Sequence, residues 1–242
     1  EVDYSAPWCA LVRVGVLCSN ASISRDTEPP STVGDPMEAA LLAAGEKAGL
    51  HRSDLLNKMP EEREVAFSSD TKMMATFHAQ DKGMYVAVKG SPESVLDACT
   101  SVRTENGKTD LTDEQRSQWN EKNTRMAGQG LRVLAFAERT ASSTQEEPYG
   151  ELTFLGLGGL MDPPRPEIGI ALSRCRKAGI RPIMVTGDQA ETARSVGKDI
   201  GLIHDEDSNR DRVREGAEIR APEAISATEA EQLREIDIFF RV

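Results

Sequence analysis

The sequence predicts two regions: an α+β domain in residues 1–150 and part of an α/β domain in residues 151–242. In the first region, short apolar runs are joined by a hairpin turn and flanked by helical patterns, which is typical of an antiparallel sheet with flanking helices. After residue 150 strands and helices alternate, which indicates a parallel sheet.

The composition is that of a globular protein with a core, since 38% of the 242 residues are hydrophobic and 29% are charged. A net charge of −11 leaves no basic field for a phosphate backbone, so we expect no nucleic-acid partner. The four cysteines, Cys9, Cys18, Cys99 and Cys175, form no C-x-x-C pair, and we predict reduced thiols. The longest apolar-leaning run, residues 152–161, is too short for a membrane helix.

The first region begins with an ambiguous segment, because residues 8–18 are compatible with a helix or with a buried strand. A polar, proline-containing loop follows. A helix is then expected, with Asp35 as N-cap, Pro36 in the first turn and Glu38 three residues after the cap. Its helical period continues to Gly49.

Strands follow in the centre of the first region. The stretches "EVAFSSDTKMMATFHA" and "GMYVAVKG", joined by the turn "QDKG", predict an antiparallel hairpin. The elements expected after it are a helix beginning at Ser91 or Pro92, a helix over residues 112–127 capped by Thr112, and a strand over residues 130–139.

The second region is expected to be half of a doubly wound parallel sheet. The predicted elements are a strand at 152–160, a helix at about 164–178, a strand at 180–185 and a helix with Ala190, Ala193, Val196 and Ile200 facing inward. Gly179 and Gly201 stand where helix C-caps belong. Three histidines, His51, His78 and His204, are far apart in sequence, and we expect no metal cage from them.

Two stretches of the first region place polar side chains at bends. In "VKGSPE", Lys89 ends a strand, Gly90 is expected to turn, and Pro92 opens a helix, which suits a nucleotide phosphate at a helix N-terminus. In "FSSDTKMM", Phe67 can stack on a flat ring, with Lys72 five residues later. The alternatives are a solvated lysine at a turn and a core phenylalanine with a surface lysine.

Three further stretches carry candidate phosphate ligands. Arg132 follows a glycine at the start of a strand and can hold a phosphate bidentately, or it is a surface arginine. Asp162 and Arg165 lie at a strand-to-helix joint, where capping of the helix by Asp162 is the alternative. The run "TGD" at 186–188 closes a predicted parallel strand with a hydroxyl, a glycine and a carboxylate, which suits a transferred phosphoryl group with Mg²⁺.

The order of these stretches resembles the P-type ATPases, and within them the type II cation pumps of the calcium-transporting kind. The stretches that carry the resemblance are "GDPMEAAL", "FSSDTKMM", "VKGSPESVLDAC", "GLRVLAFAER", "MDPPRPE", "CRKAGIRPIMVTGD" and "FFRV". The resemblance covers essentially the whole chain. It implies a nucleotide-binding domain for residues 1–150, with 1–18 near the domain junction, and part of a phosphorylation domain with a haloacid dehalogenase-like sheet for residues 151–242.

The resemblance also implies ATP and Mg²⁺ as cofactors, and it implies a role for each matching residue. Phe67 would stack on adenine, and Glu38 would contact the base side. Lys72 and Lys89 would line the adenine pocket, where Met74 would help line it and Gly90 would let the pocket approach. Arg132 would reach the phosphates, and Arg241 would lie near the ribose and phosphates. Asp162, Thr186, Gly187 and Asp188 would surround the transferred phosphoryl group. Ser69 stands where many members have an arginine, so one phosphate contact of the family is in doubt.

The family's phosphorylated D-K-T-G-T would precede Glu1, and its Mg²⁺-binding T-G-D-G-x-N-D would follow Val242. We therefore expect an excised piece of an ATP-driven cation pump, from the cytoplasmic side of a membrane, with an incomplete Mg²⁺ site. It should bind ATP without turning it over. Its partner is the remainder of the pump, and we expect a monomer, with a dimer as the alternative.

The transported ion stays open at this point: calcium follows from likeness, and proton, sodium and magnesium pumps share many of the motifs. One alternative function is a haloacid dehalogenase-like phosphatase, which needs a D-x-D nucleophile; the only such run is "DED" at 205–207. The other is a non-catalytic nucleotide-binding module.

Overall fold

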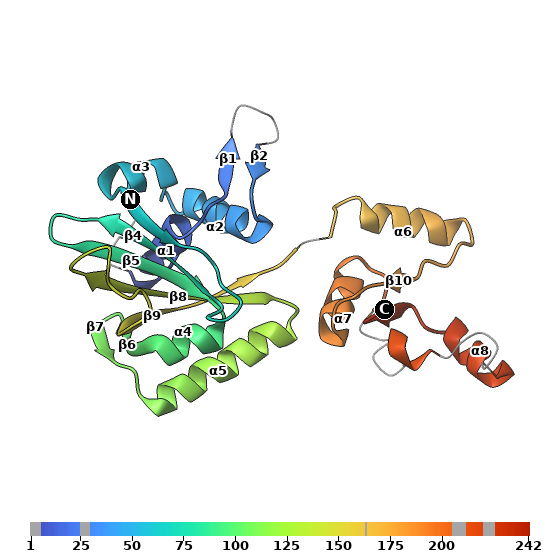
Figure 1. The fold of residues 1–242 in the computed structure, drawn as a ribbon. Coiled ribbons are helices and arrows are strands. Elements are labelled where there is room, and N and C mark those ends of the chain that lie inside the picture. Colours follow the sequence, from blue (N-terminus) through green and yellow to red (C-terminus); the bar gives the residue numbers. More distant parts are fainter. Residues whose placement is uncertain (1–5, 25–29, 163, 205–211, 220–225) are drawn as a thin grey trace. The chain divides into compact units, whose positions relative to one another are not determined.

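The computed structural model describes residues 6–24, 30–162, 164–204, 212–219 and 226–242 (Figure 1). The chain divides into two units. The first unit comprises Glu1–Thr124 with Val133–Leu160, and the second unit comprises Arg125–Arg132 with Met161–Val242. The run "DED" at 205–207 lies outside the described residues.

The first unit is built on a seven-stranded sheet with the order β3-β4-β5-β8-β9-β6-β7. The strands are β3 (Glu61–Val65), β4 (Met73–Ala79), β5 (Met84–Gly90), β6 (Cys99–Thr104), β7 (Gly107–Asp110), β8 (Arg132–Ala141) and β9 (Leu152–Leu160). The pairs β3–β4, β4–β5, β5–β8 and β6–β7 are antiparallel, but β6 pairs with β9 in parallel. The sheet is therefore mixed, and the expectation of an antiparallel sheet holds for only part of it.

The predicted hairpin is confirmed as β4 and β5. Its register pairs Met74 with Lys89 and Met73 with Gly90, so the chain that enters β4 meets the chain that leaves β5. Nearly all residues of both strands are buried, as expected for strands covered on both faces.

Helices cover both faces of this sheet (Figure 1). On one face lie α1 (Pro7–Leu17), α2 (Pro36–Lys47) and α3 (Arg52–Lys58), and on the other lie α4 (Pro92–Ala98) and α5 (Asp113–Gly128). The ambiguous first segment is thus a helix, and it buries Val14, Val16 and Leu17. A two-stranded hairpin of β1 (Ser22–Ser24) and β2 (Ser31–Val33) follows it.

The predicted helix starts are also confirmed. Asp35 caps α2 by accepting hydrogen bonds from the backbone N–H groups of Met37 and Glu38, and Ser91 caps α4. The Thr112 hydroxyl accepts from the Gln115 N–H at the start of α5. These caps satisfy N–H groups that a helix leaves unpaired at its first turn.

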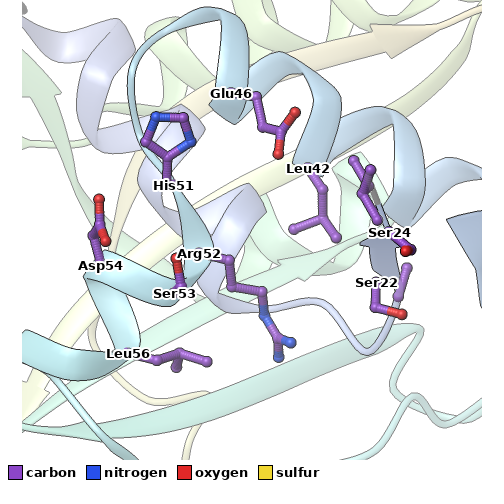
Figure 2. Close-up of a pocket in the computed structure, with 11 residues that line it drawn as sticks. Ser22, Ser24, Leu42, Glu46, His51, Arg52, Ser53, Asp54 and Leu56 are labelled. Atoms are coloured by element: carbon purple, nitrogen blue, oxygen red, sulfur yellow. The ribbon is translucent and has the colours of Figure 1, made fainter. Parts of the chain in front are cut away.

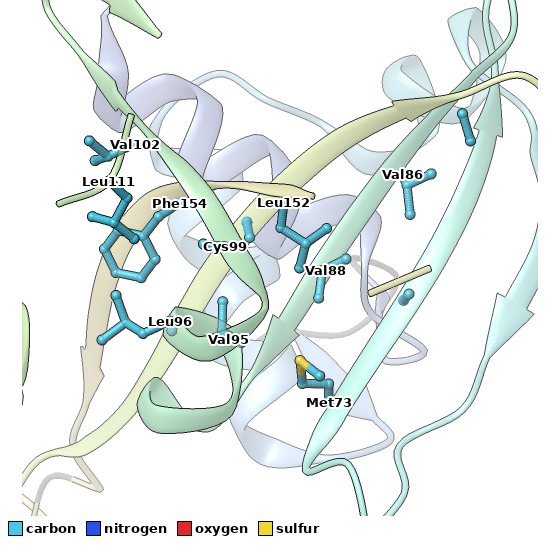
Figure 3. Close-up of a cluster of buried hydrophobic side chains, with 14 of the residues drawn as sticks. Met73, Val86, Val88, Val95, Leu96, Cys99, Val102, Leu111, Leu152 and Phe154 are labelled. Atoms are coloured by element: carbon cyan, nitrogen blue, oxygen red, sulfur yellow. The ribbon is translucent and has the colours of Figure 1, made fainter. Parts of the chain in front are cut away.

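The main core of the first unit lies between the sheet and α4 with α5 (Figure 3). It contains Phe77 and Phe154, both fully buried, and Trp119 of α5 packs edge-to-face on Phe154 with ring centroids 5.0 Å apart. Arg116 of α5 donates to the backbone carbonyl of Leu96 and to that of Cys99. A second cluster lies under α1 and includes Met74 and Phe136.

Strand β9 corrects one prediction. Its sequence was expected to open the parallel sheet of the second region, but β9 lies inside the sheet of the first unit, between β8 and β6. Its first five residues are buried. A continuous apolar run indicates a strand covered on both faces, and this property does not say which sheet contains it.

The second unit contains a small parallel sheet with the order β10-β12-β11. Its elements are α6 (Ile168–Lys177), β10 (Met184–Val185), α7 (Ala190–Asp199), β11 (Val213–Glu215), the 3-10 turn η2 (Gly216–Glu218), α8 (Ala227–Arg234) and β12 (Ile238–Phe240). The core consists of Ala193, Leu202, Ile203, Val213 and Ile238. Alternating strands and helices are confirmed here.

The elements of the second unit are shorter than predicted. β10 has only two residues, and Ile180 and Ile183 before it are exposed. Pro182, which cannot donate to a ladder, lies in the part that does not pair. Gly179 and Gly201 have φ values of +76° and +71° just after α6 and α7, which confirms them in C-cap positions.

Cys18, Cys99 and Cys175 are free thiols, as predicted. None of the helices in the described parts of the chain has both the length and the apolar composition needed to cross a membrane.

Candidate functional site

The centre of the candidate site is an ion pair between Lys89 and Glu38. The Lys89 Nζ lies 2.6 Å from the Glu38 Oε1, and Lys89 is only 7% exposed. The other oxygen of Glu38 accepts from the backbone N–H groups of Asn20 (2.7 Å) and Ala21 (2.9 Å). The carboxylate is therefore fixed by three donors, and it holds the ammonium in a defined position.

Lys89 has apolar neighbours on both adjacent strands. On the neighbouring strands its register partners are Met74 and Phe136, which belong to the buried cluster under α1 together with Cys18. Burial raises the pKa of the Cys18 thiol to about 12, so this thiol is uncharged at neutral pH. The ammonium thus lies at the end of a stem with apolar neighbours, with Glu38 as its anionic partner.

The loop that carries Phe67 and Lys72 is tied to the same end of the hairpin. The Lys72 N–H donates to the Ser68 carbonyl (2.7 Å), and the Lys72 carbonyl accepts from the Ser91 N–H (2.9 Å). Lys72 has a positive φ of 55°. Phe67 is 64% exposed, so the alternative of a core phenylalanine is wrong. An exposed aromatic ring is available to stack on a flat ligand.

Gly90 does not turn the chain, contrary to the prediction, because it is the last residue of β5 and is buried there. Its small size has another reason. A Cβ at this position would lie 2.4 Å from the Lys72 carbonyl oxygen and 2.8 Å from the Met73 Cγ. Glycine therefore permits the close approach of the loop before β4.

Two other predicted nucleotide ligands differ in exposure. Met74 is 3% exposed and belongs to the core, so little of its side chain is accessible to a ligand. Arg132 is exposed at the first position of β8, which fits both of the interpretations given above.

In the second unit, "TGD" and Arg241 come together at the carboxyl ends of β10 and β12. The Thr186 hydroxyl donates to the Asp188 Oδ2 (2.9 Å) and accepts from the Asp188 N–H (3.1 Å). The Arg241 N–H donates to the Asp188 carbonyl (3.2 Å), and its guanidinium lies 3.3 Å from a carboxylate oxygen of Glu215. Gly187 is open, since a Cβ there would meet nothing within 4 Å. These contacts place four of the predicted residues at one edge of the small sheet.

Asp162 is exposed between β9 and α6. The N-cap of α6 is Glu167, so the alternative that Asp162 caps this helix is wrong. Among the hydrogen bonds of the described residues, none joins Asp162 to Thr186 or Asp188. No group of His, Cys, Asp and Glu side chains suited to a metal ion occurs in the part of the chain that the structure describes.

A cavity of about 780 Å³ lies between α2, α3 and β1 (Figure 2). His51, Arg52 and Asp54 of the α3 side line it together with Leu42 and Glu46 of α2. None of the residues predicted to bind nucleotide lines this cavity. Its volume alone does not make it the site, because the ion pair and the exposed ring lie elsewhere.

Two buried carboxylates were missed at the sequence level. Glu138 binds Arg13, Arg103 and Tyr85, and Asp237 binds Arg181 (2.9 Å) and Arg212 (2.6 Å). The available signal was a charged residue inside an apolar strand, in "LAFAERT", or directly before one, in "REIDIFF". Such residues are rarely buried without partners.

Comparison with known proteins identifies the family of the chain. Residues 7–167 match the family described as "P-type ATPase, cytoplasmic domain N". The chain belongs to this family. It is 39% identical over 198 residues to the cation-transporting ATPase pma1 of Synechocystis, 38% identical over 195 residues to calcium-transporting ATPase 1 of Bacillus cereus, and 32% identical over 219 residues to the sodium/potassium-transporting ATPase subunit alpha of Tetronarce californica.

These alignments cover 80%, 78% and 82% of the chain but only 22%, 21% and 21% of the three relatives. The chain therefore spans about a fifth of the length of these relatives. The family match includes the whole sheet of the first unit, from β3 to β9, and ends within the segment before α6.

Proposed function

We propose that the first unit binds the adenine nucleotide of an ATP-driven cation pump, at the end of the β4–β5 hairpin. One observation carries this proposal: the buried Lys89–Glu38 pair and the exposed ring of Phe67 occur at the same end of that hairpin. An apolar, flat surface beside a fixed ammonium matches the chemistry of a nucleotide, which has an aromatic base and anionic phosphates.

Each residue of the proposed site has its own role in binding. Phe67 stacks on the base, Lys72 and Lys89 line the pocket with Met74 at its floor, and Glu38 orients Lys89 and faces the base. The Lys89 ammonium has three N–H donors, and Glu38 takes one of them. The others are free to turn toward a ligand. Gly90 keeps the loop of Lys72 close to β5, and Arg132 at the start of β8 would serve the phosphates.

For the second unit we propose part of a haloacid dehalogenase-like phosphorylation domain. Its support is the parallel sheet and the hydrogen-bonded turn of Thr186, Gly187 and Asp188 at the strand ends, where open α/β sheets bind ligands. Together with Asp162 this turn would hold the transferred phosphoryl group. ATP would supply that group and Mg²⁺ would offset its charge.

In the whole protein, the proposed activity is ATP hydrolysis through an aspartyl-phosphate, coupled to cation transport. The chain would lie on the cytoplasmic side of a membrane, with the remainder of the pump as its partner. Relatives named as calcium-transporting and as sodium/potassium-transporting ATPases support transport of a cation, and calcium is the proposed ion. We expect this chain to bind ATP as a monomer.

A calorimetric titration with ATP tests the proposal, using the wild type, Phe67→Ala, Lys89→Ala and the control Lys58→Gln. Lys58 is exposed in the last turn of α3, outside the proposed site. We expect wild-type binding to survive in Lys58→Gln and to fall at least tenfold in each of the other variants, since each loses about 1.4 kcal/mol or more. Equal affinity in all four proteins would contradict the proposal.

A further inference from the structure

A second cavity of the first unit, of about 540 Å³, lies on the face of the sheet that α1 covers. Its charged lining consists of Arg13, Arg103, Lys108, Arg139, Glu138 and Glu151. Four cations thus face two carboxylates in a chain whose net charge is −11. The cavity is therefore locally rich in positive charge, although the chain as a whole is negative.

Glu138 organises the cations. It is 6% exposed; its Oε2 accepts from the Tyr85 hydroxyl (2.6 Å) and from the Arg13 Nη2 (3.3 Å), and its Oε1 accepts from the Arg103 Nη2. Burial, followed by the charge of Glu138, raises the pKa of Tyr85, so its hydroxyl remains a donor. Two guanidiniums therefore share one carboxylate. With Arg139 paired to Glu146, the rest of the charged lining is three cations (Arg13, Arg103 and Lys108) against two carboxylates (Glu138 and Glu151), an excess of one positive charge.

Both guanidiniums retain unused donors. Their Nε–H groups are buried and have no hydrogen-bond partner in the part of the chain that the structure describes. Folded proteins leave few buried polar groups unpaired, and each exception calls for an explanation such as a bound ion. Arg139 is already neutralised by Glu146, whereas Lys108 is exposed on β7 at the rim of the cavity.

We propose that this cavity binds a small oxyanion, the phosphate or carboxylate group of a metabolite-sized ligand, between Arg13, Arg103 and Lys108. Planar guanidinium forks match such groups, and the volume lies within the range of small-molecule sites. Tyr85 and Lys89 lie four residues apart on the same face of β5, about 13 Å along the strand. The cavity is therefore separate from the proposed nucleotide site.

The test is a titration of the isotope-labelled chain, followed by amide chemical shifts, with inorganic phosphate, pyrophosphate and citrate as separate probes. We expect saturating shifts at residues 101–104 and 138–140. Arg103→Gln should weaken binding of the best probe roughly tenfold, because a hydrogen-bonded charge is lost, and Lys108→Gln about threefold. Lys58→Gln and Lys89→Ala should leave the affinity unchanged.

The probes separate the sources of the anion: saturation by the phosphates alone assigns a phosphate ligand, and saturation by citrate as well assigns oxyanions in general. Lys108→Gln keeps the test valid if Arg103→Gln does not fold, because Lys108 is exposed at the rim. Absence of saturating shifts with all three probes would overturn the proposal. So would shifts that Lys58→Gln reduces as much as Lys108→Gln does, or shifts that disappear in Lys89→Ala while that variant remains folded.

Discussion

Both units consist of strands and helices, but they differ in how completely their strands are buried. In the first unit, β4 and β5 are buried along nearly their whole length between two layers of helices. In the second unit, β10 pairs two residues with β12, and Val185 is 60% exposed. A parallel strand normally has both faces covered. Both units therefore have a core, but the second is small and leaves apolar strand surface uncovered.

The largest expected effect concerns the core of the first unit. Phe77→Ala should lower its free energy of unfolding by about 3–5 kcal/mol, because a fully buried ring leaves a cavity. Urea unfolding followed by tryptophan fluorescence measures this, since the chain's two tryptophans, Trp8 and Trp119, belong to the first unit. Phe67→Ala removes the same side chain from an exposed position and should change stability by only about 0.5 kcal/mol. Similar losses in both variants would contradict the assignment of Phe77 to the core and Phe67 to the surface.

The second prediction separates the units. Asp237→Asn should destabilise the second unit by roughly 2–3 kcal/mol, because a buried carboxylate that holds Arg181 and Arg212 loses its charge. Hydrogen exchange of the β12 amides should accelerate, while the tryptophan-detected unfolding of the first unit stays unchanged. The control is Glu231→Gln, which removes an exposed carboxylate of α8 and should have almost no effect. If the tryptophan transition shifts as well, the units do not unfold independently.

The third prediction is a pH dependence specific to the first unit. His78 is fully buried, and burial lowers its pKa to about 4, below the usual value of about 6.5. The contribution of neutral His78 to the free energy of unfolding is therefore complete above pH ~6.5 and is lost as the pH falls toward 4, because the unfolded chain binds the proton first. The expected loss between pH 7 and 5 is roughly 2 kcal/mol. Urea midpoints at the two pH values measure the loss, and His78→Gln should reduce the difference. An unchanged difference in that variant would assign the pH dependence to other groups.

The smallest effect concerns helix caps in the two units. Asp35→Ala removes the N-cap of α2 and should cost the first unit about 1 kcal/mol. Ser226→Ala removes the corresponding cap of α8 and should leave the tryptophan transition where it is. Asp35→Asn keeps an accepting oxygen and should behave almost like the wild type. Equal shifts from the two alanine variants would break the distinction between the units.

The local features of the fold could be predicted from the sequence because they depend on residues close together. The caps Asp35 and Thr112, the hairpin that ends at Gly90 and the C-cap at Gly179 each follow from a few neighbouring residues. The place of β9 could not be predicted in this way. β9 pairs in parallel with β6, with Leu152 opposite Cys99. Local residue patterns do not indicate which strands pair when they are so far apart in the sequence.

In the candidate site, too, features set by nearby residues could be predicted and features that depend on distant contacts could not. Phe67 and Lys89 could be identified from local sequence as candidate ligands, although the turn predicted at Gly90 was wrong, and their assignment to a nucleotide stays a prediction. That Glu38 fixes Lys89, and that the amides of Asn20 and Ala21 fix Glu38, depends on how α2 packs against the sheet. The steric reason for Gly90 likewise appears only when the carbonyl of the neighbouring loop is in place.

We propose that the first unit by itself forms the nucleotide pocket. The most direct test is an ATP titration of the isotope-labelled chain, with amide shifts followed in both units. We expect saturating shifts in residues 67–74 and 89–91 that persist in Asp237→Asn with the same affinity. ATP shifts confined to residues 184–188 and 238–242, or binding that disappears in Asp237→Asn while the first unit remains folded, would contradict it.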